Sequence, residues 1–398
     1  MNSTLSLSER FNRIGELLQV HQAIWQPQPF KQPQPDWCQQ LPQLDQRLQS
    51  LELATTEQLA SNNPALLAWL SPVLPVLAEL AGLIDLPALP THPTATPDAH
   101  FWRDIPGRKQ AQIEAFVAVS SQASPALEWC AGKGHLGRLL AFGGVADVLS
   151  LELDPVLCAA GEALTRRTRQ TQRFTAIDVL SPAAATLIAG RHCHALHACG
   201  ALHRHLVNLA CNTSLPSLQL APCCYYRWAD EYYTARSTAG RRSGLRLSRD
   251  DLRLAVTETV TADGRENRLR QRGHAWRLGF DALRRQLTGD AAYQPQAPIP
   301  TAWLSGSFAD FCQHMAQRRA FALPADLDWP YWEHEANVAF LRFSQRSLPR
   351  FAFRRAIETW LVLDLALALQ EAGYQVAVGT FCPTSLTPRN LLITARRP

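Results

Sequence analysis

Short apolar runs alternate with amphipathic segments through the middle of the chain. The apolar runs have the length of strands and cover residues 126–129, 145–153, 173–179, 193–199 and 217–223. Segments with helical spacing lie between them, and another precedes the first run. Strands that alternate with helices form a parallel sheet covered by helices on both faces. The pattern therefore predicts an α/β fold.

The end of the chain extends this sheet. A long helix is expected over residues 350–372, with Gly373 as its C-cap. Two strands, 373–382 and 390–397, follow it and are joined by a short turn that contains proline. We therefore predict a Rossmann-like, seven-stranded sheet that ends in an antiparallel hairpin.

Two regions lack this alternation. Residues 1–100 have helical spacing broken by prolines and include a Pro/Gln-rich arm at 26–35. Residues 227–345 are first rich in arginine and then rich in aromatic side chains. The predicted organisation is an N-terminal helical region (1–100), a Rossmann-like domain (101–226 and 346–398) and an insertion that recognises the substrate (227–345).

Composition narrows the class of protein. The chain has 398 residues, of which 46% are hydrophobic and 18% are charged, so it is too apolar for a disordered protein. No apolar run reaches the roughly 18 residues that a membrane helix needs, and the N-terminus has charges where a signal peptide is apolar. The ten cysteines form no CxxC pair. We expect a cytoplasmic protein with reduced thiols, no membrane association and no metal, because adjacent cysteines rarely chelate one zinc ion.

One strand end carries a pattern typical of nucleotide-like ligands. The first predicted strand ends at Glu128, and a G-x-G loop with Gly132 and Gly134 follows before an apolar helix start. Glycine lets such a loop turn tightly and approach a ligand. Because Gly137 completes G-x-G-x-x-G, a nicotinamide cofactor remains an alternative on the glycines alone. An acid four residues before the first glycine instead fits a ligand with an ammonium group, and S-adenosylmethionine has one.

The segment EWCAGKGHLGRLL, residues 128–140, resembles motif I of class I methyltransferases. More narrowly, the chain resembles the methyltransferase-like domain family that includes the ribosomal-RNA-adenine-dimethylase-domain-containing and glutathione-S-transferase-C-terminal-domain-containing proteins. Stretches that fit this family lie at 106–110, 151–155, 196–200, 222–225 and 387–390. Adjacent cysteines also occur in tRNA 2′-O-methyltransferases of the acceptor stem, but histidines follow them there and tyrosines follow them here. The resemblance covers roughly residues 101–226 and 350–398.

The expected cofactor is S-adenosylmethionine. Glu152, at the second strand end, suits the ribose hydroxyls, and Asp154 replaces it if the register slips by two. Asp178 would accept a hydrogen bond from the adenine amino group or cap a helix, and Lys133 would bind the methionine carboxylate or merely solvate the loop. The complete set of expected cofactor-binding residues is Glu128, Gly132, Lys133, Gly134, Leu136, Glu152, Asp154, Asp178, Val179, His197 and Cys199.

The expected catalytic residues line a pocket at the ends of the fourth and fifth strands. They are His197, Cys223, Cys224 and Tyr225. The alternative for the two cysteines is core packing, and a catalytic thiolate is the less favoured interpretation, since no basic neighbour is apparent that would lower a pKa.

The expected substrate is RNA, either tRNA or rRNA. Residues 227–290 contain 14 arginines and nine acidic residues with aromatic residues between them, which suits phosphates and stacked bases. Within this segment the expected RNA-binding residues are Arg268, Arg270, Arg272 and Trp276. A solvated arginine-rich face is the alternative.

The sequence thus predicts an S-adenosylmethionine-dependent methyltransferase that acts on RNA. The alternatives are a protein methyltransferase, a nicotinamide oxidoreductase, and a non-catalytic RNA-binding or assembly factor that retains a cofactor pocket. The oligomeric state stays open.

Overall fold

The computed structural model describes residues 5–258 and 264–398, and the chain divides into two compact units. The first unit comprises Met1–Val20, Glu79–Val260 and Arg354–Pro398, and the second comprises His21–Ala78 and Thr261–Phe353. These boundaries differ from those that the sequence predicts. The N-terminal helix and the first part of the predicted insertion belong to the same unit as the sheet.

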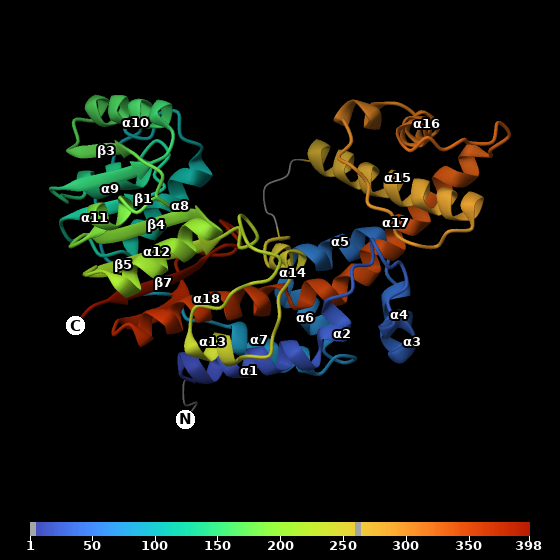
Figure 1. Cartoon of the computed structure of the whole chain (residues 1–398), viewed down its shortest axis with the longest axis horizontal. Coiled ribbons are helices and arrows are strands. Elements are labelled where there is room, and N and C mark those ends of the chain that lie inside the picture. Colours follow the sequence, from blue (N-terminus) through green and yellow to red (C-terminus); the bar gives the residue numbers. More distant parts are fainter. Residues whose placement is uncertain (1–4, 259–263) are drawn as a thin grey trace. The chain divides into compact units, whose positions relative to one another are not determined.

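The first unit is built on a seven-stranded sheet with the order β3-β2-β1-β4-β5-β7-β6 (Figure 1). Its first five strands pair in parallel, and β7 is antiparallel to both β5 and β6. The strands are β1 (Ala126–Trp129), β2 (Val148–Glu152), β3 (Gln172–Ala176), β4 (His192–Cys199), β5 (Ser217–Cys223), β6 (Gln375–Thr380) and β7 (Leu391–Arg396). The predicted Rossmann-like α/β fold is confirmed.

The remaining elements of the first unit are helices. They are α1 (Leu7–Val20), α7 (Val76–Ile84, which crosses the division between the units), α8 (Gly107–Ala118), α9 (His135–Phe142), α10 (Pro155–Arg167), α11 (Ala184–Ile188), α12 (Ala201–Asn212), α13 (Thr238–Arg242), α14 (Arg249–Leu254) and α18 (Arg354–Glu371). Phe116 of α8 and Leu140 of α9 share one apolar cluster with Val148 of β2. Burial of this surface removes apolar area from water and fixes the helices on the strands.

Helix α18 explains why the N-terminal helix belongs with the sheet. Every residue of α18 from Ala356 to Leu369 is buried, as expected for a helix that is covered all round. The apolar stripe of α1 packs on it, and the rings of Phe11 and Trp360 stack with centroids 4.9 Å apart. The predicted continuous helix over 350–372 is in fact two helices, because α17 ends at Ala352 and α18 begins at Arg354.

The second unit is helical. It contains α2 (Gln22–Trp25), α3 (Trp37–Gln40), α4 (Pro42–Gln49), α5 (Leu53–Ser61), α6 (Asn63–Leu70), α15 (Gly264–Thr288), the 3₁₀ helix η1 (Thr301–Ser305), α16 (Phe308–Arg318) and α17 (Trp329–Ala352). Aromatic residues of α15, α16 and α17 form its core. The Pro/Gln-rich arm is held to α17, since Arg350 donates to the carbonyls of Trp25 and Gln26 at 2.8 and 2.6 Å. None of the helices in the described chain combines the length and the apolar character needed to cross a membrane.

Candidate cofactor and acceptor site

The loop between β1 and α9 has a backbone that only glycine adopts easily. Gly132 and Gly134 have φ values of +57° and +66°. A Cβ atom at Gly134 would collide with Gln172 and Phe174 of β3, whereas a Cβ atom at Gly132 would have no neighbour within 4 Å. The second glycine therefore permits close packing under the loop. The first lies beside open space, where a ligand can approach the backbone.

Glu128 lies beneath this loop rather than beside the open space. Its side chain is 4% exposed and accepts hydrogen bonds from Ser150 at 2.8 Å and from Gln172 at 3.3 Å. Burial raises the pKa of Glu128 to about 7, against the opposing effect of hydrogen bonds from Ser150 and from the backbone N–H groups of Gly137 and Leu136. We therefore assign Glu128 to holding β1 against the start of α9. This burial argues against the direct ammonium contact expected from the sequence.

Glu152, at the end of β2, faces the loop. Its carboxylate accepts from the backbone N–H of Gly132 at 2.7 Å and from that of Asp154 at 3.1 Å. Asp154 instead caps α10, because its side chain accepts from the N–H of Val156 at 2.8 Å. Of these two acids, only Glu152 therefore presents its carboxylate beside the glycine loop.

The other expected cofactor residues differ in the exposure of their side chains. Asp178 is exposed two residues after β3 and accepts from the N–H of Leu180 at 2.9 Å. Lys133 is exposed at the tip of the loop, whereas the side chains of Val179 and Leu136 are buried at 4% and 3% exposure. Asp178 and Lys133 can therefore meet a ligand with their side chains. Val179 and Leu136, whose side chains are buried, can contribute to the site only through packing.

Cys130 joins these groups, and sequence reasoning missed it. Burial raises the pKa of its thiol, and the neighbouring charges of Glu152, Cys199 and Asp178 raise it further. Cys130 therefore lies near the acids at the ends of β2 and β3 and near Cys199 of β4. Its position between Glu128 and the first glycine was the available indication in the sequence, and in the structure its φ is +56°.

His197 lies at an irregularity near the end of β4. The pairing of β4 with β5 shifts register between Leu196 and Cys199, and His197 has a φ of +66°. Its Nε2 lies 3.0 Å from Oε1 of Gln112 on α8. Desolvation lowers the pKa of His197 against an opposing effect of Cys224, and Lys109 also lowers it, so the neutral ring is favoured.

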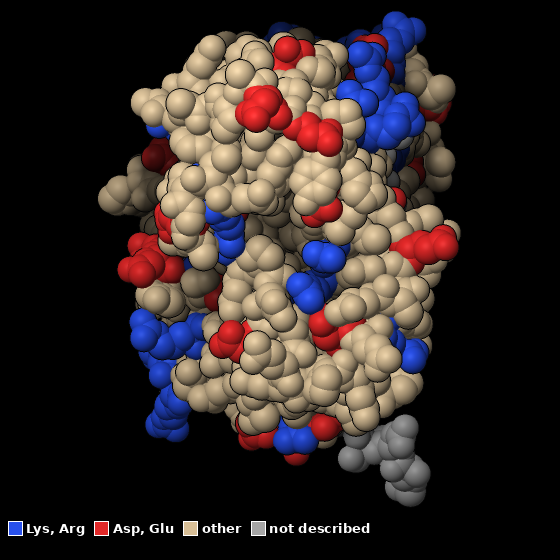
Figure 2. Space-filling view, turned by 90° about the vertical axis from the view of Figure 1, so that its right-hand side faces the viewer, with Lys and Arg blue, Asp and Glu red and all other residues tan. Residues whose placement is uncertain are grey.

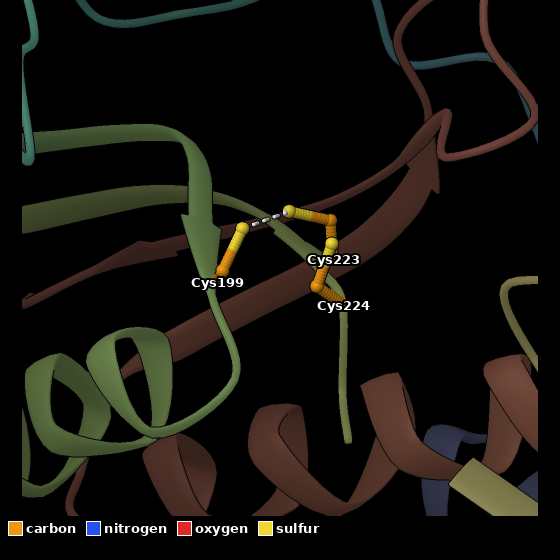
Figure 3. A group of neighbouring side chains, drawn as sticks. All are labelled: Cys199, Cys223 and Cys224. Atoms are coloured by element: carbon orange, nitrogen blue, oxygen red, sulfur yellow. Dashed lines mark hydrogen bonds between the residues drawn. The ribbon is translucent and has the colours of Figure 1, made fainter. Parts of the chain in front are cut away.

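Three thiols meet at the ends of β4 and β5 (Figure 3). Sγ of Cys199 lies 3.5 Å from Sγ of Cys223, and the sulfurs of Cys199, Cys223 and Cys224 all lie within 4.8 Å of one another. Hydrogen bonds from the other two thiols lower the pKa of Cys224, and Arg227 and Arg389 act in the same direction.

Tyr225 does not line this site. Its ring is 2% exposed, and its hydroxyl donates to Pro222 at 3.3 Å and to Glu358 at 3.4 Å. Glu358 also pairs with Arg355 at 2.7 Å. The expected pocket-lining role of Tyr225 is therefore replaced by a buried link between β5 and α18.

The expected RNA-binding residues lie on α15 in the second unit. Trp276 is 5% exposed within the aromatic core, so it is not placed to stack on a base. Arg272 donates to the carbonyl of Leu304 at 2.9 Å and lies over the Trp276 ring. Arg268 and Arg270 are exposed. On the molecular face in Figure 2, basic groups are interspersed with acidic ones and most of the surface is uncharged.

Two other contributors were also missed. Ser150 lies inside the otherwise apolar run of β2 and Gln172 begins β3, and both hydrogen-bond Glu128. Ser150 is the register partner of Glu128 across β1 and β2, so a polar residue at that strand position could have revealed the cluster.

Comparison with known proteins agrees with this geometry. Residues 108–231 match the model of a family described as a methyltransferase domain. No curated protein and no solved structure has significant similarity to the chain. The matched segment runs from α8 past β5 and includes the glycine loop, Glu152 and the three thiols. The first unit thus contains a segment that matches a methyltransferase domain.

Proposed function

We propose that the first unit binds S-adenosylmethionine at the carboxyl ends of β1 to β4 and transfers its methyl group. The observation that carries this proposal is the open space beside Gly132, next to the carboxylate of Glu152. Ligands of open α/β sheets bind outside the carboxyl ends of the strands. When it is bound, the cofactor supplies an electrophilic methyl group on a sulfonium.

The donor groups fit the parts of that cofactor. Glu152 accepts from the ribose hydroxyls, and Asp178 accepts from the adenine amino group. Lys133 and the backbone N–H groups of the loop receive the methionine carboxylate. Buried Glu128 holds the loop in place, so the ligand meets a preorganised backbone and less ordering is needed on binding.

The role of the chain at the acceptor is to position a nucleophile and exclude water. A neutral nitrogen or sulfur nucleophile needs no dedicated base, and orientation alone lowers the barrier. The His197 ring and the three thiols lie at the ends of β4 and β5, next to Cys130 of the glycine loop. They are the groups that an acceptor would meet.

We propose RNA as the acceptor. The support is the excess of arginine in residues 227–290 and the exposure of Arg268 and Arg270. With Trp276 buried, phosphate contacts rather than stacking would provide the affinity. The narrower family resemblance stays a prediction.

Two measurements test these proposals. Isothermal titration should give micromolar affinity for S-adenosylmethionine, about −7 to −8 kcal/mol, and much weaker binding of NAD. Equal affinity for NAD would favour an oxidoreductase. Incubation with methyl-labelled cofactor and either total RNA or total protein should label the RNA, and label found only in protein would reject the RNA proposal.

A charge-matched pair of variants tests the RNA surface. Arg268→Ala with Arg270→Ala should weaken RNA binding in gel shifts and reduce the log–log salt slope by about 1.4, since each lost contact to single-stranded RNA removes about 0.7. The control is Arg166→Ala with Arg173→Ala, which removes two exposed arginines of the first unit. Equal effects of the two pairs would show that net charge alone, and not α15, governs binding.

A further inference from the structure

The three thiols come together through the geometry of two neighbouring strand ends. Cys199 and Cys223 are register partners across β4 and β5, after the irregularity that follows Leu196. Cys224 has a φ of +46°, which is unusual for a residue with a side chain. Figure 3 shows the side chains of Cys199 and Cys223 directed toward each other from neighbouring strand ends, with Cys224 next to Cys223. The backbone is thus shaped to gather the side chains.

The spacing of the sulfurs suits one thiophilic cation. A tetrahedral ion with bonds of about 2.3 Å to sulfur places its sulfur ligands roughly 3.8 Å apart. In this cluster the sulfurs of Cys199 and Cys223 are 3.5 Å apart, and all three sulfurs lie within 4.8 Å of one another. The sulfur–sulfur distance expected around a tetrahedral ion falls between these two values. A disulfide would instead need the closest pair to shorten to about 2.05 Å. Small side-chain rotations suffice for the metal.

The charges around the cluster also suit a metal thiolate. Three thiolates and a divalent cation carry one net negative charge. Arg227 and Arg389 are close enough to lower the pKa of Cys224, so they would offset that charge. From the sequence we expected no metal because two adjacent cysteines are a poor chelate. Cys199, which lies 24 residues before Cys223, supplies the third ligand that this argument did not include.

We propose that Cys199, Cys223 and Cys224 form a site for one Zn²⁺ ion, whose fourth position is left for a ligand that is not one of these thiols. Three protein ligands and one open position are typical of catalytic rather than structural zinc. Zinc with an open position lowers the pKa of the group that occupies it, whether water or an acceptor thiol or hydroxyl. This proposal does not rest on methyl transfer, because its three ligands come from the ends of β4 and β5 and none comes from the glycine loop.

Cobalt spectroscopy tests the site on the full chain. The protein is reduced with a phosphine, stripped of metal and titrated with Co²⁺. A thiolate-to-cobalt charge-transfer band and strong visible bands should saturate at one equivalent and disappear when Zn²⁺ is added. Cys224→Ser and Cys199→Ser should weaken binding at least 100-fold, whereas Cys211→Ser on α12 should bind like the parent. Absence of a saturating band, or a band retained in Cys224→Ser, overturns the proposal.

A measurement on the parent protein avoids any folding defect in the variants. Alkylation followed by mass spectrometry should show that Zn²⁺ protects Cys199, Cys223 and Cys224 while Cys211 reacts at its original rate. Uniform reactivity with and without zinc contradicts the site. A disulfide between Cys199 and Cys223 in protein isolated without oxygen would show a redox pair instead. S-adenosylmethionine binding is read separately, so failure of one proposal leaves the other testable.

Discussion

Gly134→Ala and Gly132→Ala form a matched pair that tests the glycine loop. Both substitutions place a methyl group on a residue with positive φ, which costs about 1–2 kcal/mol. At Gly134 the new methyl would also meet Gln172 and Phe174, and overpacking typically adds about 1–3 kcal/mol. Gly134→Ala should therefore lower the free energy of unfolding by about 2–5 kcal/mol. Gly132→Ala should lower it by only about 1–2 kcal/mol.

Displacement of Gln172 by the new methyl group would break its buried hydrogen bonds. Its Nε2 donates to the carbonyl of Gly134 at 2.9 Å and to the Ser150 hydroxyl at 2.7 Å. A shift of this side chain would leave buried polar atoms unpaired, which raises the cost. At Gly132 the methyl group would instead enter the space proposed for the cofactor, so the loss should be in ligand affinity.

Chemical denaturation and calorimetry on both variants separate the two effects. The expected result is a large loss of stability in Gly134→Ala, and a small loss in Gly132→Ala together with at least tenfold weaker binding of S-adenosylmethionine. Equal destabilisation by both changes would refute the packing argument. Unchanged cofactor affinity in Gly132→Ala would refute the placement of the ligand.

Three further substitutions test other parts of the account. Folding raises the pKa of Glu128 to about 7, so the stability contributed by the protonated Glu128 is present below about pH 4.5 and lost as the pH rises to 7. In urea unfolding, the stability of Glu128→Gln relative to the parent should therefore increase by roughly 3 kcal/mol over that range. A difference that does not depend on pH would contradict the burial of Glu128. Tyr225→Phe removes the hydrogen bond to Glu358 and should lower the free energy of unfolding by about 1 kcal/mol with little change in turnover. A 10³-fold loss of turnover with intact cofactor binding would instead show that Tyr225 is catalytic. Gly15→Ala places a methyl group 2.9 Å from Nε1 of Trp360 and should lower the melting temperature of the first unit; a neutral effect would show that α1 packs loosely.

The sheet could be predicted from sequence because its signal is local. Each strand is a short apolar run next to an amphipathic helix, and the final hairpin follows a long apolar helix. Boundaries were less accurate, since the third strand was expected to extend to residue 179 but ends at Ala176. Glu152 and Asp154 were distinguished only by the hydrogen bonds that each makes.

The division into units depended on contacts between residues distant in the chain. The hydroxyls of Tyr233 and Ser237 donate to Asp364 of α18 at 2.8 and 2.6 Å, which ties the start of the predicted insertion to the first unit. No local sequence pattern indicates that the carboxylate of Asp364 is buried. The burial of Trp276 was recognisable, because Phe280 and Leu283 follow at helical spacing and share its core.

The sequence predicted those parts of the candidate site that belong to a local motif. It did not predict the parts that depend on contacts between distant residues. The glycine loop and Glu152 were identified from spacing. The meeting of Cys199 with Cys223 and Cys224 required the register shift at the end of β4, which the sequence does not encode in any local pattern. The burial of Glu128 depended on polar partners from two other strands.

Calorimetric titration of the demethylated product into the parent and into Glu152→Ala tests the central claim most directly. We expect micromolar binding to the parent and a loss of about 1.5–3 kcal/mol in the variant, which is roughly 10- to 150-fold, because a two-point hydrogen bond to the ribose is removed. Glu162→Ala, which removes a neighbouring acid on α10, is the control and should bind like the parent. Equal affinity in Glu152→Ala and the parent, or no binding to the parent, would contradict the assignment of this site to S-adenosylmethionine.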